Sequence, residues 1–407
     1  MIFDTEQYLR SRYKDYYQGH FVIADKPENR EFGIGVFGKK ISSRHLHFRT
    51  NYELNDYLRR ETPFYVSCSM AYYKNPGARP MQAKEIFGSD LLFEFDADDL
   101  PTECKAKHDY WYCQKCDCSG TGRLETCPNC KANTKIFDYI CDECIEEAKK
   151  QTKLLISVLI SELGFKEEEI SISFSGHKGY HIKIKSDKIY SLNQGERNEI
   201  IDYITKTGLS AKKIGYRYPK IIITDPLLKQ DFRDYLEKNK TKDFLKFGLD
   251  ANTAKNLIKN KEGVIRAFEK NVAFSLSFSD NKSKELWDKI MASFLAKIKM
   301  KQKLNIDANT TVDIFKIVRV PETIHGGSGL IAKSIKISEL DAFEPFRDAY
   351  PFNKNGNIKI YIEKMPRLKL NGNYYGPYFK EPVDLPENIA IYLLAKGSAD
   401  GIILWNN

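Results

Sequence analysis

The chain has 407 residues, 42% of them hydrophobic, and a formal net charge of +9 at pH 7. This length suffices for one large domain with insertions or for two domains, and the hydrophobic content can close a core. The sequence lacks a run of about 18 apolar residues that could span a bilayer, and its N-terminal segment MIFDTEQYLRSRYKDYY is charged where a signal peptide is apolar. These features argue against membrane-spanning and secreted proteins, so we expect a globular cytoplasmic protein with no membrane partner. The positive charge suits a polyanionic partner but is also common in ordinary enzymes.

The first hundred residues alternate short strand-like runs with turns. These runs are FGIGVFG, HLHF, FYVSCSMAYY and SDLLFEFDADDL. Residues 146–163 place Leu155, Leu159 and Leu163 at i, i+4 spacing before Gly164, which predicts an amphipathic helix with a glycine stop. The alternating runs ISISFSG and YHIKIK are joined by a tight HKG turn and predict a hairpin. We expect the next helix to begin near Ser191, which can act as its N-cap.

A helical, lysine-rich pattern follows from about residue 225 to residue 300, in segments such as DPLLKQDFRDYLEKN and NKSKELWDKIMASFLAKIK. Period-two character returns in TVDIFKIVRV, and a mixed tail contains IKIYIEK and IAIYLLAK. Strands before and after two insertions predict one discontinuous α/β (mixed α+β) core. We expect this core to comprise residues 1–103, 145–214 and 301–407, interrupted by a zinc-binding insertion at 104–144 and a helical insertion at 215–300.

Eight of the nine cysteines lie between Cys104 and Cys144, and only Cys68 stands apart. Paired CxxC knuckles in a cytosolic chain favour metal binding over disulfides. One set reads CxxC, ten residues, CxxC, and two such knuckles can close a tetrahedral S₄ zinc site. The members of this set are Cys113, Cys116, Cys127 and Cys130. Cys118 competes with Cys116 for this site, and we expect it to remain a free thiol.

The segment LLFEFDADDL combines apolar and acidic residues in alternation. A strand's period of two places Glu94, Asp96 and Asp98 on one face, opposite the apolar side chains. Neighbouring carboxylates repel each other, and a bridging Mg²⁺ or Mn²⁺ relieves this repulsion. The alternative is a strand that ends in a solvated acidic turn. Downstream, Asp307 and Asp313 are both candidates for a third carboxylate, and their spacing does not choose between them.

Two glycine-containing segments are candidates for phosphate binding. SFSGHKGYHIKI sets Ser175, Lys178 and His181 around two glycines, whose backbone N–H groups can approach a ligand closely. These donors suit a polyphosphate. In IVRVPETIHGGSGL, Arg319 and His325 accompany three glycines after a strand-like run. An ordinary hairpin and a Pro/Gly loop are the alternative interpretations of the two segments.

Taken together, these motifs resemble the small catalytic subunit of the archaeal and eukaryotic DNA primases, along nearly the whole chain. The resemblance includes RSRYKDYY, REFGIGVF and SRHLHF near the N-terminus, and AYYKNPGARPMQAKEIFGSDLLFEFDADDL before the paired aspartates. SGHKGYHI matches the family's SGxxGxH motif, VPETIHGGSGL corresponds to LPGSLHGxTGL, and LPENIAIYLLAKG resembles its tail. The resemblance implies a mixed α/β catalytic core whose active site opens on a surface groove.

The resemblance also implies roles for individual residues. Asp96 and Asp98 correspond to the paired ligands of Mg²⁺ or Mn²⁺, and Asp307 lies fourteen positions before Pro321, as the family's third carboxylate does. The implied contacts to nucleotide phosphates are Ser175, Lys178, His181, Arg319 and His325, with Arg30 of the REF segment as a further contact. His177 stands where some relatives have arginine. The remaining cysteine-rich half-sites resemble the family's zinc site, with Asp142 in place of a proline; they are Cys104, His108, Cys141 and Cys144. We therefore expect two structural zinc ions.

The function that the resemblance implies is template-dependent synthesis of short primers on single-stranded DNA. Two-metal nucleotidyl transfer from nucleoside triphosphates would release pyrophosphate, and a large primase subunit would complete a heterodimer. One alternative is a stand-alone primase-polymerase or repair polymerase of the same superfamily. Another is a non-catalytic zinc-ribbon protein that binds nucleic acid, although an acidic strand face repels phosphate in the absence of metal. For the helical insertion, a solvated lobe is favoured over a clamp on the template.

Overall fold

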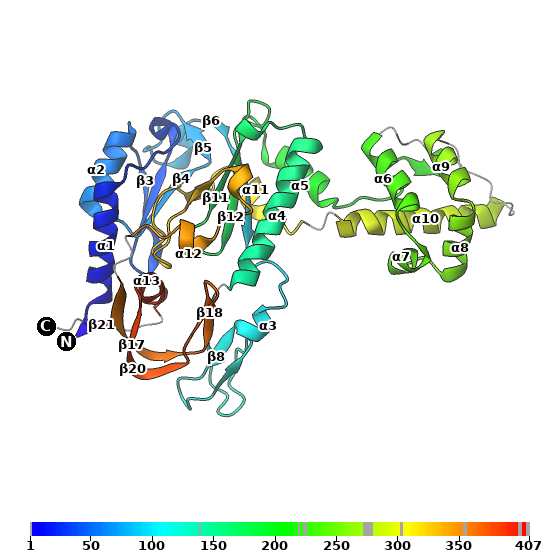
Figure 1. Ribbon diagram of the computed structural model, residues 1–407. Coiled ribbons are helices and arrows are strands. Elements are labelled where there is room, and N and C mark those ends of the chain that lie inside the picture. The colour runs from blue at the N-terminus through cyan, green and yellow to red at the C-terminus, as the bar shows by residue number, and fades with distance from the viewer. Residues whose placement is uncertain are drawn as a thin grey trace. The chain divides into compact units, whose positions relative to one another are not determined.

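The structure is a computed structural model that describes residues 2–137, 139, 141–218, 220–221, 223, 226–271, 280–301, 304–352, 356–397 and 401–403. The chain folds into two compact units, one formed by Met1–Asn198 with Asn305–Asn407 and the other by Glu199–Leu304. Helices and strands alternate along the first unit (Figure 1), which confirms the predicted mixed α/β class. In the part of the chain described, no helix combines the length and apolar character that crossing a bilayer requires.

Two four-stranded antiparallel sheets form the centre of the first unit. Their strand orders are β16-β11-β12-β7 and β15-β4-β2-β3. The first sheet contains β7 (Leu91–Asp96), β11 (Ile170–Phe174), β12 (Gly179–Ile184) and β16 (Ser334–Ile335). The second contains β2 (Phe32–Val36), β3 (Lys39–Leu46), β4 (Tyr65–Ser69) and β15 (Ile317–Arg319). The hairpin predicted from ISISFSG and YHIKIK is therefore present as β11 and β12.

The register of β7 against β12 brings the acidic segment beside the SGHKGYH segment. Gly179 pairs with Asp96 and His181 pairs with Glu94. Along β12, Tyr180 and the isoleucines are buried, whereas His181 and Lys183 share the half-buried face. The predicted period of two therefore holds along β12 and along β7 as far as Asp96, because each strand packs an apolar face into the core.

Helices pack on these sheets from both sides (Figure 1). They include α1 (Thr5–Gly19), α2 (Asn51–Glu61), α4 (Asp142–Ser161) and α13 (Glu387–Lys396). Helix α4 is the amphipathic helix predicted after the cysteines; it buries Leu155 and Leu159 and contacts β7 and β12. It begins four residues earlier than expected, where Asp142 and Glu143 complement the positive end of the helix dipole.

Helix α5 (Gln194–Thr205) begins three residues after the expected Ser191 cap. Asn193 caps it instead: its side-chain oxygen accepts from the Glu196 N–H, and the Glu196 carboxylate accepts from the Asn193 N–H. This reciprocal pair is a capping box, which satisfies two backbone donors where a lone serine would satisfy one.

The cysteine-rich insertion has its own small sheet, in the order β10-β8-β9. Its elements are α3 (Lys105–His108), β8 (Tyr110–Tyr112), β9 (Ser119–Thr121) and β10 (Lys135–Phe137). Trp111 packs with Cys113 and Cys127 in a separate cluster. This cluster is small compared with the core of an independent domain.

A further sheet closes the first unit with the order β1-β21-β17-β20. It joins the two ends of the chain, β1 (Ile2–Phe3) and β21 (Gly401–Ile403), to β17 (Asn357–Met365) and β20 (Tyr378–Pro386). The short hairpins of this unit are β5 (Ala71–Tyr73) with β6 (Ile86–Ser89), and β18 (Leu368–Leu370) with β19 (Asn373–Tyr375).

The second unit is mainly helical, as its sequence predicts. It contains β13 (Tyr216–Arg217), β14 (Lys220–Ile221), α6 (Pro226–Glu237), α7 (Thr241–Lys246), α8 (Ala251–Lys259), α9 (Lys261–Glu269) and α10 (Asp280–Lys301). Asp225, where the predicted pattern starts, lies outside the described residues. An aromatic core that includes Trp287, Phe232 and Phe294 holds the helices together, and the Phe232 and Phe268 rings stack at 3.7 Å between centroids.

Candidate functional site

A cavity of about 300 Å³ lies between the two central sheets of the first unit. Side chains from both sheets and from the loops beside them line it. The lining residues include Glu94, Asp96, Ser175, His177, Lys178, His181, Lys316, Arg319, His325 and Lys40. Carboxylates from β7 thus face cations and imidazoles from β12, β15 and the loops. Asp98, Asp307 and Arg30 do not line this cavity.

The acidic wall comes from β7, whose residues alternate between core and cavity. Phe93 and Phe95 are buried, whereas Glu94 and Asp96 are half-buried on the other face. The strand ends at Asp96, so Asp98 lies in the following turn. The period-two pattern, which places Asp98 on the strand, is wrong at this residue. The reason is the partner strand: β12 begins at Gly179, and beyond it only the Ala97 N–H donates across, to the Lys178 carbonyl.

The charge of Asp96 is disfavoured where it stands. Burial, together with the nearby carboxylates Glu94, Asp99 and Asp98, raises the pKa of its carboxyl to about 6 against the opposing charge of Lys178. Lys178 Nζ also contacts the Asp98 carboxylate. A cation bound among these carboxylates would stabilise the ionised form of Asp96.

Of the two downstream carboxylates, Asp307 connects to this acidic wall. It caps the short helix α11 (Ala308–Val312) by accepting from the Asn309 N–H at 3.0 Å. Thr310 Oγ1 lies 2.7 Å from Asp307 Oδ2 and 3.0 Å from Glu94 Oε2. Asp313 ends the same helix and accepts from the Phe315 N–H. The period-two pattern of TVDIFKIVRV therefore misleads at its start, because the Asp307 cap turns residues 308–312 into a helix.

The turn between β11 and β12 is held by Ser175. Its Oγ accepts from the backbone N–H groups of His177, Lys178 and Gly179 at 3.3, 3.1 and 3.1 Å. Gly179 allows the close approach of β7, since a Cβ there would stand 1.8 Å from the Phe95 carbonyl oxygen. The structure thus gives Ser175 a structural task in addition to its place on the cavity wall.

Burial keeps two histidines of the cavity neutral. It lowers the pKa of His181 to about 4, although Glu94 lies 3.5 Å from its Nε2. Burial also holds the pKa of His325 well below its ordinary value, and Arg319 and His177 lower it further. The Gly327 N–H donates to His325 Nδ1 at 3.2 Å, which leaves Nε2 to carry the proton. The rings of His325 and His177 stack at 4.6 Å between centroids.

Arg319 is the main cation of the opposite wall. It pairs with Ser67 across the β15–β4 register, and its guanidinium lies 5.1 Å from the centre of the Tyr65 ring. Burial lowers its pKa to about 10. Its Nη1 is buried, and the described part of the chain offers it no hydrogen-bond partner. A buried unsatisfied donor of positive charge suits an anionic ligand.

Arg30, which the sequence predicts as a further nucleotide contact, does not line this cavity. It is fully buried, and its guanidinium donates to the carboxylates of Asp25 and Asp90 and to the carbonyls of Ser69 and Met70. It lines a neighbouring cavity of about 320 Å³ that shares His181 and Arg319. Because its donors are engaged inside the protein, we leave Arg30 out of the proposed site.

Two further lysines, Lys40 and Lys316, line the cavity without belonging to any of the sequence motifs. Lys316 Nζ lies 2.8 Å from Thr310 Oγ1 and 3.5 Å from Glu94 Oε2. It stands just before β15, three residues from Arg319, so strand alternation does not associate the two. Lys40 follows a tight turn in which a solvated lysine is ordinary, and no local pattern distinguishes it.

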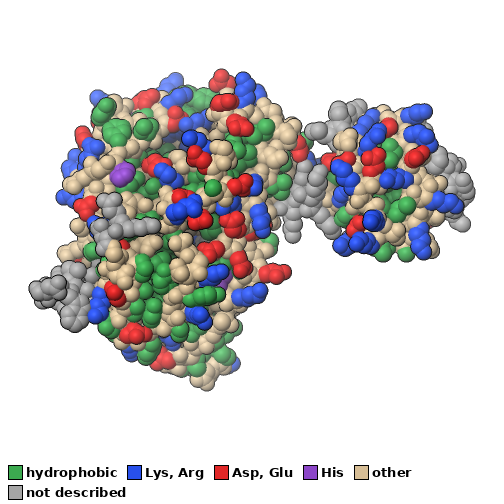
Figure 2. Space-filling model, in the orientation of Figure 1, with side chains coloured by type: hydrophobic (Ala, Val, Ile, Leu, Met, Phe, Trp, Pro, Cys, Tyr) green, Lys and Arg blue, Asp and Glu red, His purple; other side chains and the backbone are tan. Residues whose placement is uncertain are grey.

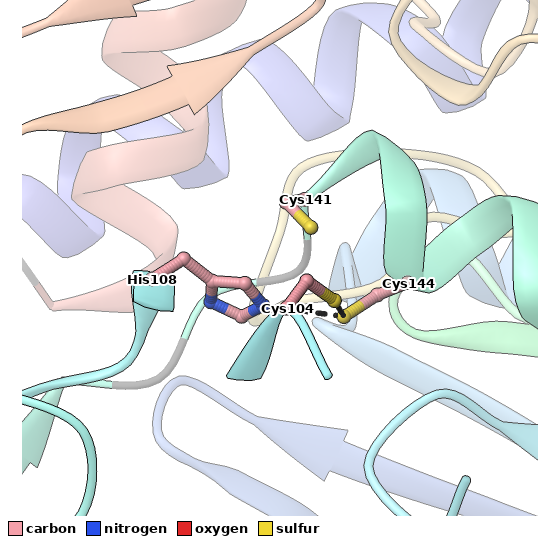
Figure 3. Close-up of side chains that lie close together, drawn as sticks. All are labelled: Cys104, His108, Cys141 and Cys144. Atoms are coloured by element: carbon pink, nitrogen blue, oxygen red, sulfur yellow. Dashed lines mark hydrogen bonds between the residues drawn. The ribbon is translucent and has the colours of Figure 1, made fainter. Parts of the chain in front are cut away.

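The cysteine-rich insertion contains two groups that could each hold a metal ion. In each group, four ligand atoms lie within 4.8 Å of one another. One group is Cys113, Cys116, Cys127 and Cys130; the other is Cys104, His108, Cys141 and Cys144, drawn in Figure 3. These are the two sets of four expected from the sequence. Cys118 belongs to neither, and its sulfur accepts from Asn129 Nδ2 at 3.5 Å.

The sulfur separations suit a shared metal ion. Cys104 and Cys144 Sγ are 3.2 Å apart, Cys113 and Cys130 Sγ 3.4 Å. A disulfide requires about 2.05 Å, whereas the edge of a tetrahedron with zinc–sulfur bonds of 2.3 Å is about 3.8 Å. The thiols are free cysteines crowded toward common centres. Their chemistry therefore fits zinc.

Comparison with known proteins agrees with these motifs. The family model described as "DNA primase small subunit" matches residues 137–337. The DNA primase small subunit PriS of Methanothrix thermoacetophila is 30% identical over 422 residues, covering 97% of this chain and 98% of that protein. The proteins of the same name from Cenarchaeum symbiosum and Thermoplasma volcanium are 29% and 27% identical, and each alignment covers at least 96% of both chains. This chain belongs to the DNA primase small subunit family.

Proposed function

We propose that the chain synthesises short primers on a single-stranded DNA template by nucleotidyl transfer from nucleoside triphosphates, with release of pyrophosphate. Membership of the family implies a nucleotidyltransferase. The observation that carries the finer proposal is the cavity in which crowded carboxylates face the unsatisfied guanidinium of Arg319. A nucleoside triphosphate with its metal ions has the matching charges.

Asp96, Asp98 and Asp307 would hold Mg²⁺ or Mn²⁺ in this proposal. Their chemistry fits a hard cation, because oxygen ligands are preferred and the carboxyl of Asp96 is buried among like charges that Lys178 offsets only in part. When bound, such ions activate an attacking hydroxyl and stabilise the leaving pyrophosphate. Glu94 stands between Asp96 and Asp307, with Thr310 bridging it to Asp307. This arrangement holds the carboxylates before substrate arrives, so little reorganisation is needed at the reaction.

The opposite wall would bind the triphosphate. Arg319 offers a charged donor, Lys178 a second positive charge, and neutral His325 a proton on Nε2. Lys178 pairs with Asp98 in the structure, and phosphate oxygens would compete for its ammonium. His181, also neutral, lies between the acidic wall and Arg319 and would donate to a phosphate oxygen. These groups would orient the α-phosphate for in-line attack, and no protein nucleophile is required.

Each group of four ligands in the insertion would bind one zinc ion. Four protein ligands leave no position for water, so both ions would be structural. The small separate core around Trp111 supports this assignment, since such a module gains its stability from metal binding.

We further propose that the chain works as a heterodimer with a large primase subunit, a proposal that rests on the family alone. A stand-alone primase-polymerase or repair polymerase would use the same cavity. A non-catalytic zinc-ribbon protein that binds nucleic acid is the alternative from another class, and the carboxylate wall argues against it.

The deciding experiment measures incorporation of labelled nucleotide by the purified chain on a single-stranded template, with and without Mg²⁺ or Mn²⁺. We expect incorporation that requires both template and metal. Incorporation without template would indicate a different nucleotidyl transfer. Tight binding of DNA with no incorporation under any metal would support the non-catalytic alternative.

A further inference from the structure

The cysteine-rich insertion extends to the turn that carries Asp98. Arg123 lies in the insertion between β9 and Cys127. Its Nε donates to Asp109 Oδ2 at 2.5 Å, and its Nη2 lies 3.9 Å from Asp98 Oδ1. One guanidinium therefore spans a carboxylate of the insertion and a carboxylate of the proposed catalytic set.

Asp109 in turn contacts a proposed zinc ligand. It is 1% exposed, and its Oδ1 lies 3.1 Å from Nδ1 of His108. His108 Nε2 faces the cysteines, 3.2 Å from Cys144 Sγ. If Nε2 binds zinc, Nδ1 carries the proton and can donate it to Asp109, as metal-bound histidines donate to carboxylates. Both atoms are buried, and in the described part of the chain neither has a hydrogen-bond partner, so each approaches the other at 3.1 Å with its hydrogen-bonding capacity unused.

A second contact holds the same turn through its backbone. Lys105, next to Cys104, donates from Nζ to the carbonyl oxygens of Asp98 at 2.5 Å and Leu100 at 2.8 Å. The turn is thus held at its main chain by Lys105 and at its acidic side chain by Arg123. Both residues come from the insertion, beside proposed zinc ligands.

The burial of Asp109 distinguishes this arrangement from an ordinary surface ion pair. Arg123 is 48% exposed, and a pair between two such side chains contributes little to stability. A carboxylate buried as deeply as Asp109 is costly unless charged donors satisfy it. Arg123 lies beside one of its oxygens and His108 beside the other. The buried Asp109 therefore holds a defined position between His108 and Arg123, the residue that reaches Asp98.

We propose that Asp109 and Arg123 are positioning residues that couple the Cys104, His108, Cys141 and Cys144 group to Asp98. His108, which would bind zinc through Nε2, would orient Asp109, and Asp109 would orient Arg123 toward the carboxylate proposed to take part in divalent metal binding. The inference rests on the proposed function of Asp98. It gives the insertion a role in the reaction besides its own stability.

The experiment measures the Mn²⁺ affinity of the full chain from the EPR signal of free Mn²⁺, with zinc content determined on each sample. The variants are Arg123→Ala, Arg123→Lys and His108→Ala, and Lys115→Ala is a matched control because Lys115 is exposed in the same insertion. Thermal unfolding establishes that each variant is folded. Mn²⁺-dependent nucleotide incorporation is followed in parallel.

The sign of the change in Mn²⁺ affinity decides between two physical effects. Removing a positive charge near Asp98 would by itself tighten cation binding. Loss of positioning weakens it, and we expect Arg123→Ala to raise the dissociation constant for Mn²⁺ by about fivefold or more with zinc retained, a change of roughly 1 kcal/mol. Arg123→Lys should restore little of the lost Mn²⁺ affinity, because the single ammonium of lysine lacks the rigid, forked donors with which a guanidinium contacts two carboxylates. His108→Ala should lose one zinc and weaken Mn²⁺ binding similarly.

Unchanged or tighter Mn²⁺ binding by Arg123→Ala in a chain that still incorporates nucleotide would overturn the coupling and leave the proposed function intact. Loss of zinc from His108→Ala without any change in Mn²⁺ affinity would also overturn it. If the unmodified chain neither binds Mn²⁺ at a site abolished by Asp96→Asn nor incorporates nucleotide, the proposed function itself fails.

Discussion

The carboxylate of Asp96 stands where burial and like charges both oppose its ionisation. A protein tolerates such a residue when its charge serves a ligand, because removing it relieves repulsion in the free protein. Asp98 contacts Lys178, and Asp307 caps helix α11, so each of these two carboxylates has a partner in the free protein. The three residues should therefore differ in their effect on stability but not in their effect on catalysis.

We expect Asp96→Ala, Asp98→Ala and Asp307→Ala each to abolish nucleotide addition, because each removes a metal ligand. Asp96→Ala should not lower the free energy of unfolding, whereas Asp307→Ala removes a helix cap worth about 1 kcal/mol. Asp307→Asn keeps the cap and should still be inactive. Nucleotide incorporation and thermal unfolding measure the two effects. Asp313→Ala is the control, and an inactive Asp313→Ala beside an active Asp307→Ala would show that the third carboxylate is misassigned.

Lys178, His181 and Arg319 should contribute mainly to triphosphate binding. Charge-assisted contacts to phosphate are worth roughly 1.5 to 3 kcal/mol, so each alanine variant should weaken nucleotide affinity about tenfold or more. Arg319→Met should in addition stabilise the free protein, because it removes a buried cation whose Nη1 has no partner among the described residues. Titration with nucleotide and thermal unfolding test this pair of effects. Unchanged affinity in all variants would mean that the loops are only structural.

At the scale of elements, the sequence predicts best where one strand or helix face is apolar. The alternation in LLFEF and YHIKI specifies β7 and β12, and the leucine spacing of α4 specifies that helix, because each buries one face in the same core. Local patterns do not predict where an element begins or ends when a neighbouring element determines that boundary. β7 stops at Asp96 because β12 supplies no further partner, and Asp307 starts a helix that period two does not anticipate.

The candidate site shows the same division between local and tertiary information. Motif residues such as Asp96 and Arg319 could be named in advance because their segments are distinctive. The ion pairs of Arg30 could not be predicted from its motif, since only the tertiary structure reveals the carboxylates of Asp25 and Asp90 that engage it. The position of Lys316 on the cavity wall could not be predicted locally, because it depends on how the two sheets pack and on the contact with Thr310 in helix α11.

Gly179 determines how closely β12 approaches the acidic strand. A Cβ at this position would stand 1.8 Å from the Phe95 carbonyl oxygen and 3.0 Å from the Asp96 Cα. We expect Gly179→Ala to destabilise the protein by about 1 to 3 kcal/mol and to impair catalysis by displacing Asp96. Chemical denaturation measures the first effect and nucleotide incorporation the second. Gly19→Ala is the control, because a Cβ there meets no atom within 4 Å; a similar loss of stability in both variants would contradict the steric argument.

The cysteine-rich insertion should bind two zinc ions. We expect elemental analysis of the unmodified chain to give two zinc ions, because two sets of four ligands each converge on a common centre. Cys118→Ser should keep both, since Cys118 lies outside each set, and Cys127→Ser should lose one. A stoichiometry of one in the unmodified chain would contradict the division into two sites.

At the scale of the whole molecule, the first unit is built from segments far apart in the chain. Residues 1–198 and 305–407 share the sheets that form the cavity, and β15 of the last segment pairs with β4 of the first. The helical unit interrupts them and has an aromatic core of its own. Relatives align over almost the entire chain, so the likeness extends over both units as well as the motifs.

This likeness over the whole length motivates the prediction of a partner. We expect the chain to co-purify with a large primase subunit as a heterodimer, because the proteins it resembles are named as small subunits. If the proposed site is correct, the chain should extend a primer alone when one is supplied, since the proposed metal ligands and triphosphate contacts all lie within it. Starting a primer from two nucleotides should depend more strongly on the partner. Mass measurement of the purified assembly tests the first statement, and comparison of extension with initiation, with and without the partner, tests the second. A chain that runs as a lone monomer in extracts and starts primers unaided at the full rate would instead be a stand-alone primase-polymerase.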